Sequence, residues 1–138
     1  MRVALAIVVV LALSDCAAKA EPKPALGAIF NLRYGERATI STERLSLTFQ
    51  KVLEESRCPV GVTCIWEGNA RIVVMTERPP AGLSALELNT SSRYPVEAAY
   101  EGYTVRLRGV RPAPEHGRVL DAAGYSAQIE VTRTGRGD

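Results

Sequence analysis

From Leu26 onward, apolar and polar residues alternate with a period of two, and this alternation restricts the fold more than any other feature. Successive side chains of a strand point to opposite faces, so alternation buries one face and leaves the other in solvent. The last segment shows the pattern best, with Tyr125, Ala127, Ile129 and Val131 separated by polar residues. No helical apolar period is sustained, and only a turn near residues 121–123 is expected, so the sequence predicts an all-β fold.

About seven or eight short strands are predicted, over residues 30–34, 38–40, 45–53, 70–76, 86–88, 96–100, 103–107 and 125–131. The apolar phase changes after Phe49, and a β-bulge near Gln50 and Lys51 would restore it. Glu101 and Gly102 predict a tight hairpin between two of the strands. This pattern favours an antiparallel β-sandwich of immunoglobulin-like architecture, with a small barrel as the alternative.

The N-terminus has the features of an export signal. Met1-Arg2 precedes an unbroken apolar run over residues 3–13, which has the length of a signal-peptide core and is too short for a membrane span. Ala18-Lys19-Ala20 places small residues where signal peptidase requires them. We therefore predict a signal peptide over residues 1–20 and an exported protein, either periplasmic or secreted.

A second processing signal overlaps the first. Residues 13–16 resemble a bacterial lipobox ending at Cys16, although the charged Asp15 stands where that pattern has a small residue. Lipidation of Cys16, which would anchor the protein to the bacterial envelope, is thus the alternative to release. In either case we expect an extended tether over residues 21–25, a single domain over residues 26–134 and a frayed end over residues 135–138.

The charge balance excludes some classes of partner. The chain has 17 basic and 15 acidic residues, spread along its length, and removal of residues 1–20 leaves the net charge near +1. This balance gives no reason to expect nucleic acid or an anionic membrane as the partner. We expect an unknown protein or small ligand of the cell envelope instead, with membrane contact only through lipid on Cys16.

The sequence contains three cysteines, and only two free thiols remain when Cys16 is removed with the signal or carries lipid. Cys58 and Cys64 are then expected to pair in an oxidising compartment. A redox-active pair is an alternative, although thioredoxin-type motifs have two intervening residues rather than five. Metal binding is the least favoured interpretation, because the spacing is unusual and no histidine is near. We predict no metal and no cofactor.

The block Ser56-Arg57-Cys58-Pro59, followed by Cys64-Ile65-Trp66-Glu67-Gly68, is the most distinctive part of the sequence. Together with residues 103–107, 112–114 and 125–127, it resembles a family of uncharacterised bacterial secreted proteins and lipoproteins. That family is recognised by a Ser-Arg-Cys-Pro segment and a Cys-Ile/Val-Trp-x-Gly segment. The resemblance implies an exported β-domain and no particular activity.

The ring closed by Cys58 and Cys64 has two interpretations. Trp66 could pack over the disulfide while the loop caps one end of the sandwich. Alternatively, the rigid ring presents a binding surface made of Arg57, Pro59, Val60, Val62 and Trp66 to a protein or ligand. A related hypothesis is an inhibitor of an extracytoplasmic hydrolase, in which Arg57 would be the specificity residue.

The sequence contains little to suggest catalysis. His116 is the only histidine, it follows Pro114-Glu115 in a predicted loop, and no Gly-x-Ser-x-Gly motif is present. We therefore predict that the protein is not an enzyme. Asn89-Thr90-Ser91 fits the N-glycosylation acceptor pattern, which has meaning only in a host that glycosylates exported proteins.

Overall fold

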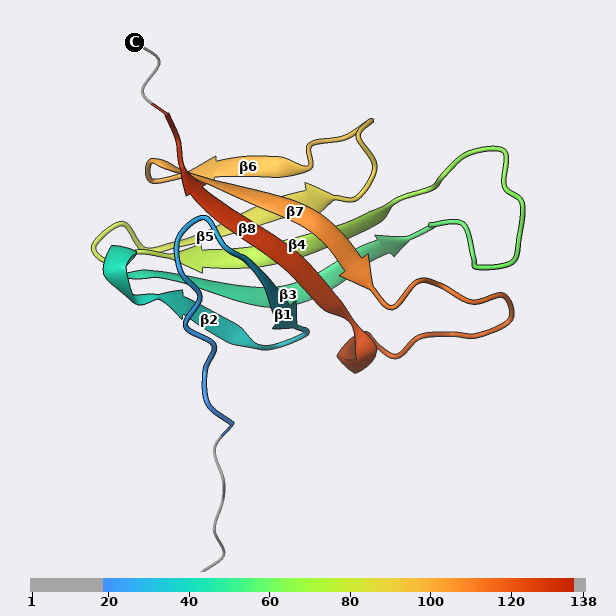
Figure 1. Cartoon of the computed structure of the whole chain (residues 1–138), viewed down its shortest axis with the longest axis horizontal. Helices are drawn as coiled ribbons and strands as arrows, with labels where there is room; N and C mark the ends of the chain where they lie inside the picture. The colour runs from blue at the N-terminus through green and yellow to red at the C-terminus, as the bar shows by residue number, and fades with distance from the viewer. Residues whose placement is uncertain (1–18, 136–138) are drawn as a thin grey trace, which may run out of the picture.

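A computed structural model describes residues 19–135 as two antiparallel sheets of four strands each, packed face to face (Figure 1). Sheet A has the order β1 (Ile29–Arg33), β8 (Ser126–Arg133), β7 (Tyr103–Arg111) and β6 (Glu97–Tyr100). Sheet B has the order β2 (Arg37–Ile40), β3 (Leu45–Glu55), β4 (Ala70–Glu77) and β5 (Leu83–Asn89). The sheets do not close into a barrel, so the predicted all-β sandwich is confirmed.

The predictions about residues 1–18, including lipidation of Cys16, lie outside the described residues. Within residues 19–135, no helix has the length and apolarity needed to cross a membrane. The segment before β1 contacts sheet B, because the backbone N–H of Thr39 donates a hydrogen bond of 3.0 Å to the carbonyl of Pro22. This contact covers part of the outer edge of β2.

The core lies between the two sheets and is built from the apolar half of each alternating strand. Its largest fully buried side chains include Leu32, Val105, Ile129 and Val131 from sheet A, and Leu47, Phe49, Ile72, Val74 and Leu88 from sheet B. The alternation in the sequence therefore arises because one face of each sheet is buried against the other sheet.

Departures from strict alternation coincide with irregular pairing. The register of β3 against β4 shifts between Phe49 and Lys51, which confirms the predicted bulge. A similar shift in β7 between Leu107 and Gly109 returns Val110 to the core, so β7 continues to Arg111 and the prediction that it ends at residue 107 is wrong. A bulge lets one strand change phase without leaving the sheet.

The predicted hairpin between β6 and β7 is present, with Glu101 at φ 47° and Gly102 at φ 82°. Two consecutive residues with positive φ give the turn a twist that matches the strands on either side. Two short 3₁₀ helices complete the structure: η1 (Ser41–Glu43), and η2 (Ala122–Gly124) at the position of the expected turn.

The sandwich has two ends with different contents. One end carries η1, the β4–β5 turn and the β6–β7 hairpin, and the other carries two long connections. We call residues 56–69, between β3 and β4, the braced loop, and residues 112–125, between β7 and β8, the facing loop. Figure 1 shows that both extend beyond the sheets at the same end.

Candidate binding site

The braced loop is closed by the disulfide between Cys58 and Cys64, whose Cα atoms are 5.9 Å apart. The predicted pairing is therefore confirmed. Because the two cysteines enclose only five residues, the bond restricts the shape of this loop and crosslinks no distant parts of the chain. The rest of the site depends on how the two ends of the loop are fixed.

Gly68 fixes the return of the braced loop to β4. Its φ is +70°, and a Cβ atom at this position would lie 1.8 Å from the carbonyl oxygen of Ser56. The close approach accompanies two backbone hydrogen bonds, from Ser56 N–H to Asn69 (2.8 Å) and from Cys58 N–H to Glu67 (3.0 Å). Only glycine fits here, so this residue of the distinctive block has a structural role.

Asn69 is the centre of a buried hydrogen-bond network at the base of the braced loop, with 2% of its surface exposed. Its Oδ1 accepts from the backbone N–H groups of Thr90 (3.2 Å) and Ser91 (3.1 Å). Its Nδ2 donates to Oδ1 of Asn89 at 2.9 Å. A buried polar side chain is tolerated when its groups are paired in this way.

The same network includes Asn89, the acceptor residue of the N-glycosylation motif. Asn89 is 5% exposed, and its Nδ2, the atom that would carry a glycan, donates to the carbonyl of Pro95 at 2.9 Å. The acceptor nitrogen is therefore buried and engaged in the folded protein. The motif residue is part of the support of the braced loop.

Arg57 joins the two loops. The exposed fraction of its side chain is only 15%, and its Nε donates to the carboxylate of Glu55 at 2.8 Å. Its two terminal nitrogens also reach the backbone carbonyls of Val110 and, at 3.0 Å, Pro112. The buried Tyr125 lies beside this pair, and burial and then the Glu55 charge raise its pKa. The hydrogen bonds of the guanidinium are thus made within the protein. The specificity residue of an inhibitor would instead project into solvent, toward the hydrolase.

The facing loop also contacts the braced loop through the backbone. The N–H of Val60 donates to the carbonyl of Pro114 at 2.9 Å, and Val60 forms an isolated parallel bridge with Glu115. His116, the next residue, is exposed. Since the two loops come from different sheets, their contact ties the sheets together at this end.

The outer part of the braced loop is apolar and exposed. Ile65 is 104% exposed, Val60 65%, Trp66 57% and Val62 41%. We call these four side chains the apolar tip. With Val119 of the facing loop, they make up five of the nine large hydrophobic residues that are exposed within residues 19–135, so exposed apolar surface is concentrated at this end. Pro59 is partly buried.

The structure therefore divides the predicted binding residues into two groups. Val60, Val62 and Trp66 are exposed on one loop, whereas Arg57 belongs to its support. Two exposed residues, Ile65 and Val119, were not selected from the sequence. Each is an aliphatic residue outside any alternating segment, so it has no strand neighbour to bury it, and that signal could have identified both.

A small cleft lies beside the apolar tip, between the two loops and the segment that follows β5. Its volume is about 320 Å³, and its lining includes Arg57, Glu67, Ser91 and Pro114. The hydroxyl of Ser91 donates to Oε1 of Glu67 at 2.6 Å. The cleft is thus lined by both polar and apolar groups, and Glu67 connects it in sequence to Trp66 of the apolar tip.

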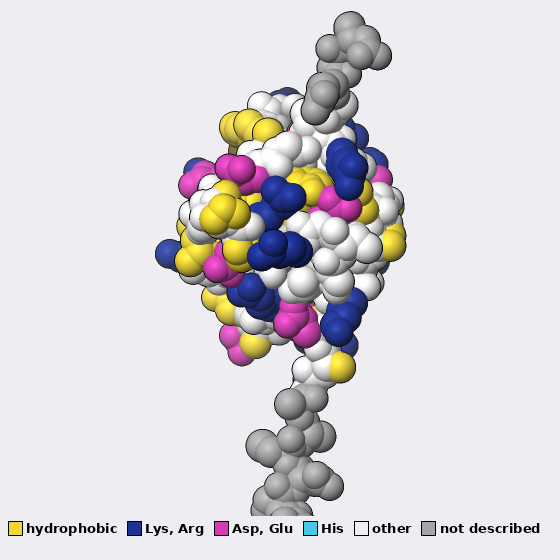
Figure 2. Space-filling model, turned by 90° about the vertical axis from the view of Figure 1, so that its left-hand side faces the viewer, with side chains coloured by type: hydrophobic (Ala, Val, Ile, Leu, Met, Phe, Trp, Pro, Cys, Tyr) yellow, Lys and Arg dark blue, Asp and Glu magenta, His cyan; other side chains and the backbone are white. Residues whose placement is uncertain are grey.

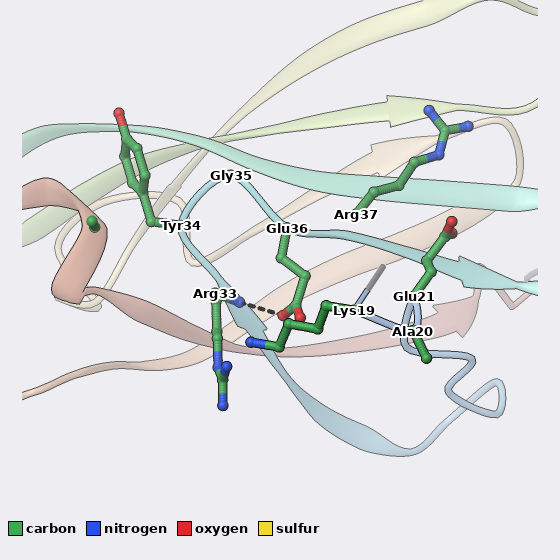
Figure 3. A pocket seen from close by; sticks show the side chains of 9 residues that line it. Lys19, Ala20, Glu21, Arg33, Tyr34, Gly35, Glu36 and Arg37 are labelled. Atoms are coloured by element: carbon green, nitrogen blue, oxygen red, sulfur yellow. Dashed lines mark hydrogen bonds between the residues drawn. The ribbon is translucent and has the colours of Figure 1, made fainter. Parts of the chain in front are cut away.

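A larger cavity of about 570 Å³ lies between residues 19–21 and the turn over residues 33–37 (Figure 3). Figure 3 shows the Lys19 side chain extending along Glu36, whose carboxylate accepts a hydrogen bond of 2.9 Å from the backbone N–H of Arg33. Lys19 and Ala20 belong to the predicted signal peptide, so processing would remove one wall of this cavity. It is a weaker candidate for a site of the exported protein.

The opposite end of the sandwich holds a compact charged cluster. The carboxylate of Glu43 accepts hydrogen bonds from the Tyr103 hydroxyl and from Arg133, the latter at 3.0 Å. Those two bonds hold the pKa of Glu43 below its usual value, and the bond to Glu43 raises the pKa of Tyr103. Arg78 lies over the Tyr103 ring, 5.4 Å from its centre. Figure 2 views this end and shows basic and acidic side chains interspersed.

Comparison of the chain with family models, with curated proteins and with solved structures gives no match. The resemblance to bacterial secreted proteins through the Ser56–Gly68 block stays a prediction. Function is therefore argued from the geometry of the two loops.

Proposed function

We propose that this protein is a non-catalytic binding module of the cell envelope, and that it contacts a partner through the apolar tip of the braced loop. In this proposal the protein is exported and works in the periplasm or outside the cell, either free or anchored by lipid on Cys16. The disulfide between Cys58 and Cys64 supports an oxidising compartment.

One observation carries the proposal: the braced loop is fixed at its base and apolar at its tip. Gly68, Asn69 and Arg57 make contacts that hold the loop in place, while Ile65 and Trp66 remain in water. Exposed apolar surface is unfavourable in water, and contact with a partner recovers about 25 cal/mol per Å² buried. A loop that is already ordered loses little entropy on binding.

The alternative functions require more than the structure offers. An inhibitor of an extracytoplasmic hydrolase would need a specificity residue other than Arg57, whose nitrogens are engaged. A redox protein would need exchange between external thiols and the Cys58–Cys64 disulfide. Incubation with a glutathione series, followed by mass analysis, measures that exchange directly.

Site-specific photo-crosslinking in the native host tests the proposal. A photoreactive phenylalanine analogue replaces Trp66 in one variant and Leu83 in another, since both side chains are more than half exposed, at 57% and 67%, and Leu83 follows the β4–β5 turn at the η1 end. We expect the label at position 66 to form one dominant adduct and the label at position 83 to form none with that protein. The same adduct should disappear when Val60→Asp is added to the first variant.

Equal labelling from both positions would contradict the proposal, and so would the absence of any adduct from position 66 in a folded, disulfide-bonded protein. Thermal unfolding of each variant shows whether the fold is intact. A variant of Trp66 that unfolds at the wild-type temperature leaves loss of contact as the only explanation for a lost adduct.

A further inference from the structure

We infer that the partner presents a lysine or arginine side chain next to an apolar residue, and that Glu67 receives the cation in the cleft beside the apolar tip. This inference rests on the proposed function and specifies the chemistry of the partner. Glu67 lines the cleft and follows Trp66 directly in the sequence, so one residue of the cleft adjoins one residue of the apolar tip.

One oxygen of the exposed Glu67 carboxylate is hydrogen-bonded at the cleft. Ser91, which is 2% exposed, donates its hydroxyl hydrogen to Oε1 of Glu67 at 2.6 Å. Ser91 is itself fixed, because its backbone N–H donates to Asn69 at 3.1 Å. A carboxylate that is already hydrogen-bonded loses less side-chain freedom when it pairs with a cation.

The charges around the cleft favour a cation. Within residues 19–135, Glu67 forms no ion pair with a lysine or arginine, whereas Glu55, Glu97 and Glu130 each pair with an arginine. Arg57 also lines the cleft, but its charge is balanced by Glu55 at close range. The three groups Glu55, Arg57 and Glu67 therefore carry one net negative charge.

The dimensions and walls suit a long basic side chain. A volume of about 320 Å³ is at the lower limit for small-ligand sites and is large enough for one lysine or arginine side chain. Ala113 and Pro114 form an apolar wall along which the methylene groups of such a side chain can lie, while its charged end reaches Glu67. Neighbouring apolar residues of the partner would then contact Trp66.

Nuclear magnetic resonance titration of the processed, disulfide-bonded protein tests this inference with three peptides. They are acetylated, amidated tripeptides with leucine at both ends and arginine, citrulline or glutamate in the middle. Citrulline has nearly the shape of arginine without its charge. We expect the arginine peptide alone to shift the backbone signals of Glu67, Gly68 and Ser91 and the indole signal of Trp66.

Two variants identify the charged group. Glu67→Gln should weaken binding of the arginine peptide by about fivefold, the upper range for a solvent-accessible ion pair. Glu115→Gln removes an exposed carboxylate on the facing loop that is already paired with Arg118, and it should leave the affinity within about twofold. Equal binding of the arginine and citrulline peptides, no effect of Glu67→Gln, or no shift at millimolar arginine peptide would overturn the inference.

The two proposals fail in different ways. If Glu67→Gln leaves the adduct from position 66 intact and the arginine peptide does not bind, the apolar tip is a contact surface without a cation site. If position 66 gives no adduct in the cell, the proposed function itself is wrong. Shifts caused equally by phosphatidylcholine vesicles would point to a lipid surface and overturn both.

Discussion

The two ends of the sandwich differ in where they place apolar side chains relative to their paired polar groups. One end carries η1, and the other carries the braced loop. At the first, Glu43, Tyr103 and Arg133 satisfy one another and join the two sheets. At the second, polar groups are equally well paired at the base, around Asn69 and Arg57, but the tip beyond them is apolar. The polar contacts at the η1 end join the two sheets, whereas those at the other end hold the base of the loop that carries the apolar tip.

The difference separates residues needed for stability from residues available for function. Glu43, Tyr103 and Arg133 of the η1 end have their partners within the molecule. Ile65 and Trp66 are exposed on a loop whose base is rigid, so their substitution should affect contacts with other molecules and leave folding unchanged. Five variants test this contrast, and they are described in order of decreasing effect.

Gly68→Ala should destabilise the protein most, by about 4 kcal/mol or more, because the added Cβ would overlap the carbonyl of Ser56. Gly61→Ala is the matched control: this glycine also has positive φ, at +80°, but nothing lies within 4 Å of the added atom. Its cost should be about 1 kcal/mol. Urea unfolding of the oxidised proteins measures both, and equal losses would show that the close approach is unimportant.

Asn69→Ala should cost about 3 kcal/mol, because it leaves the N–H groups of Thr90 and Ser91 and the amide oxygen of Asn89 without a partner in a buried setting. Asn31→Ala, at an exposed position of β1, should change the free energy of unfolding by less than about 0.5 kcal/mol. A small loss for Asn69→Ala would mean that water replaces the side chain and that the base of the loop is open.

Replacement of both Cys58 and Cys64 by serine should cost about 2 kcal/mol, the value for a ring of this size in the chain-entropy description. The fold should persist, because Gly68, Asn69 and Arg57 still hold the base of the loop. Hydrogen exchange should accelerate in residues 58–66 only. Acceleration that spreads into β3 and β4 would show that the disulfide supports the sheet as well as the loop.

Acid should weaken the η1 end through Glu43. Its pKa is lower in the folded protein than in the unfolded chain, so its contribution to stability is present above the unfolded pKa and is lost as the pH falls through the folded value. Glu43→Gln should therefore flatten the decline of the unfolding temperature below about pH 4.5. Glu101→Gln, an exposed carboxylate of the β6–β7 hairpin, is the control and should leave that decline in place.

Ile65→Val should have the smallest effect, within about 0.5 kcal/mol, because Ile65 is fully exposed. The same substitution at Ile129, which is fully buried between the sheets, should cost about 1 kcal/mol. Thermal unfolding compares them directly. A loss at Ile65 that equals the loss at Ile129 would place the apolar tip against the rest of the protein and remove the basis of the proposed function.

The fold was largely predictable because strand alternation is a local property. The positions of β4 and β8, the hairpin at Glu101-Gly102 and the bulge after Phe49 all follow from neighbouring residues. The late end of β7 was missed because its apolar phase changes at Gly109, and a phase change is easily taken for the end of a strand.

The site was predictable only in part, because its support depends on residues far apart in the sequence. The pairing of Cys58 with Cys64 and the importance of the loop followed from local spacing. The role of Arg57 depends on carbonyl groups of Val110 and Pro112, and nothing near Arg57 indicates them. Asn69 and Ser91 are likewise brought together only by the pairing of β4 with β5.

The bonds from Arg57 to Val110 and Pro112 make the braced loop dependent on completion of the chain. They span 53 and 55 residues, so both acceptors are synthesised well after the loop itself. The disulfide can form early, from residues six apart, but the support of the ring is assembled late. A chain truncated before residue 110 would carry the ring without these two bonds, so a correctly held tip requires that the chain has been synthesised and folded beyond residue 112.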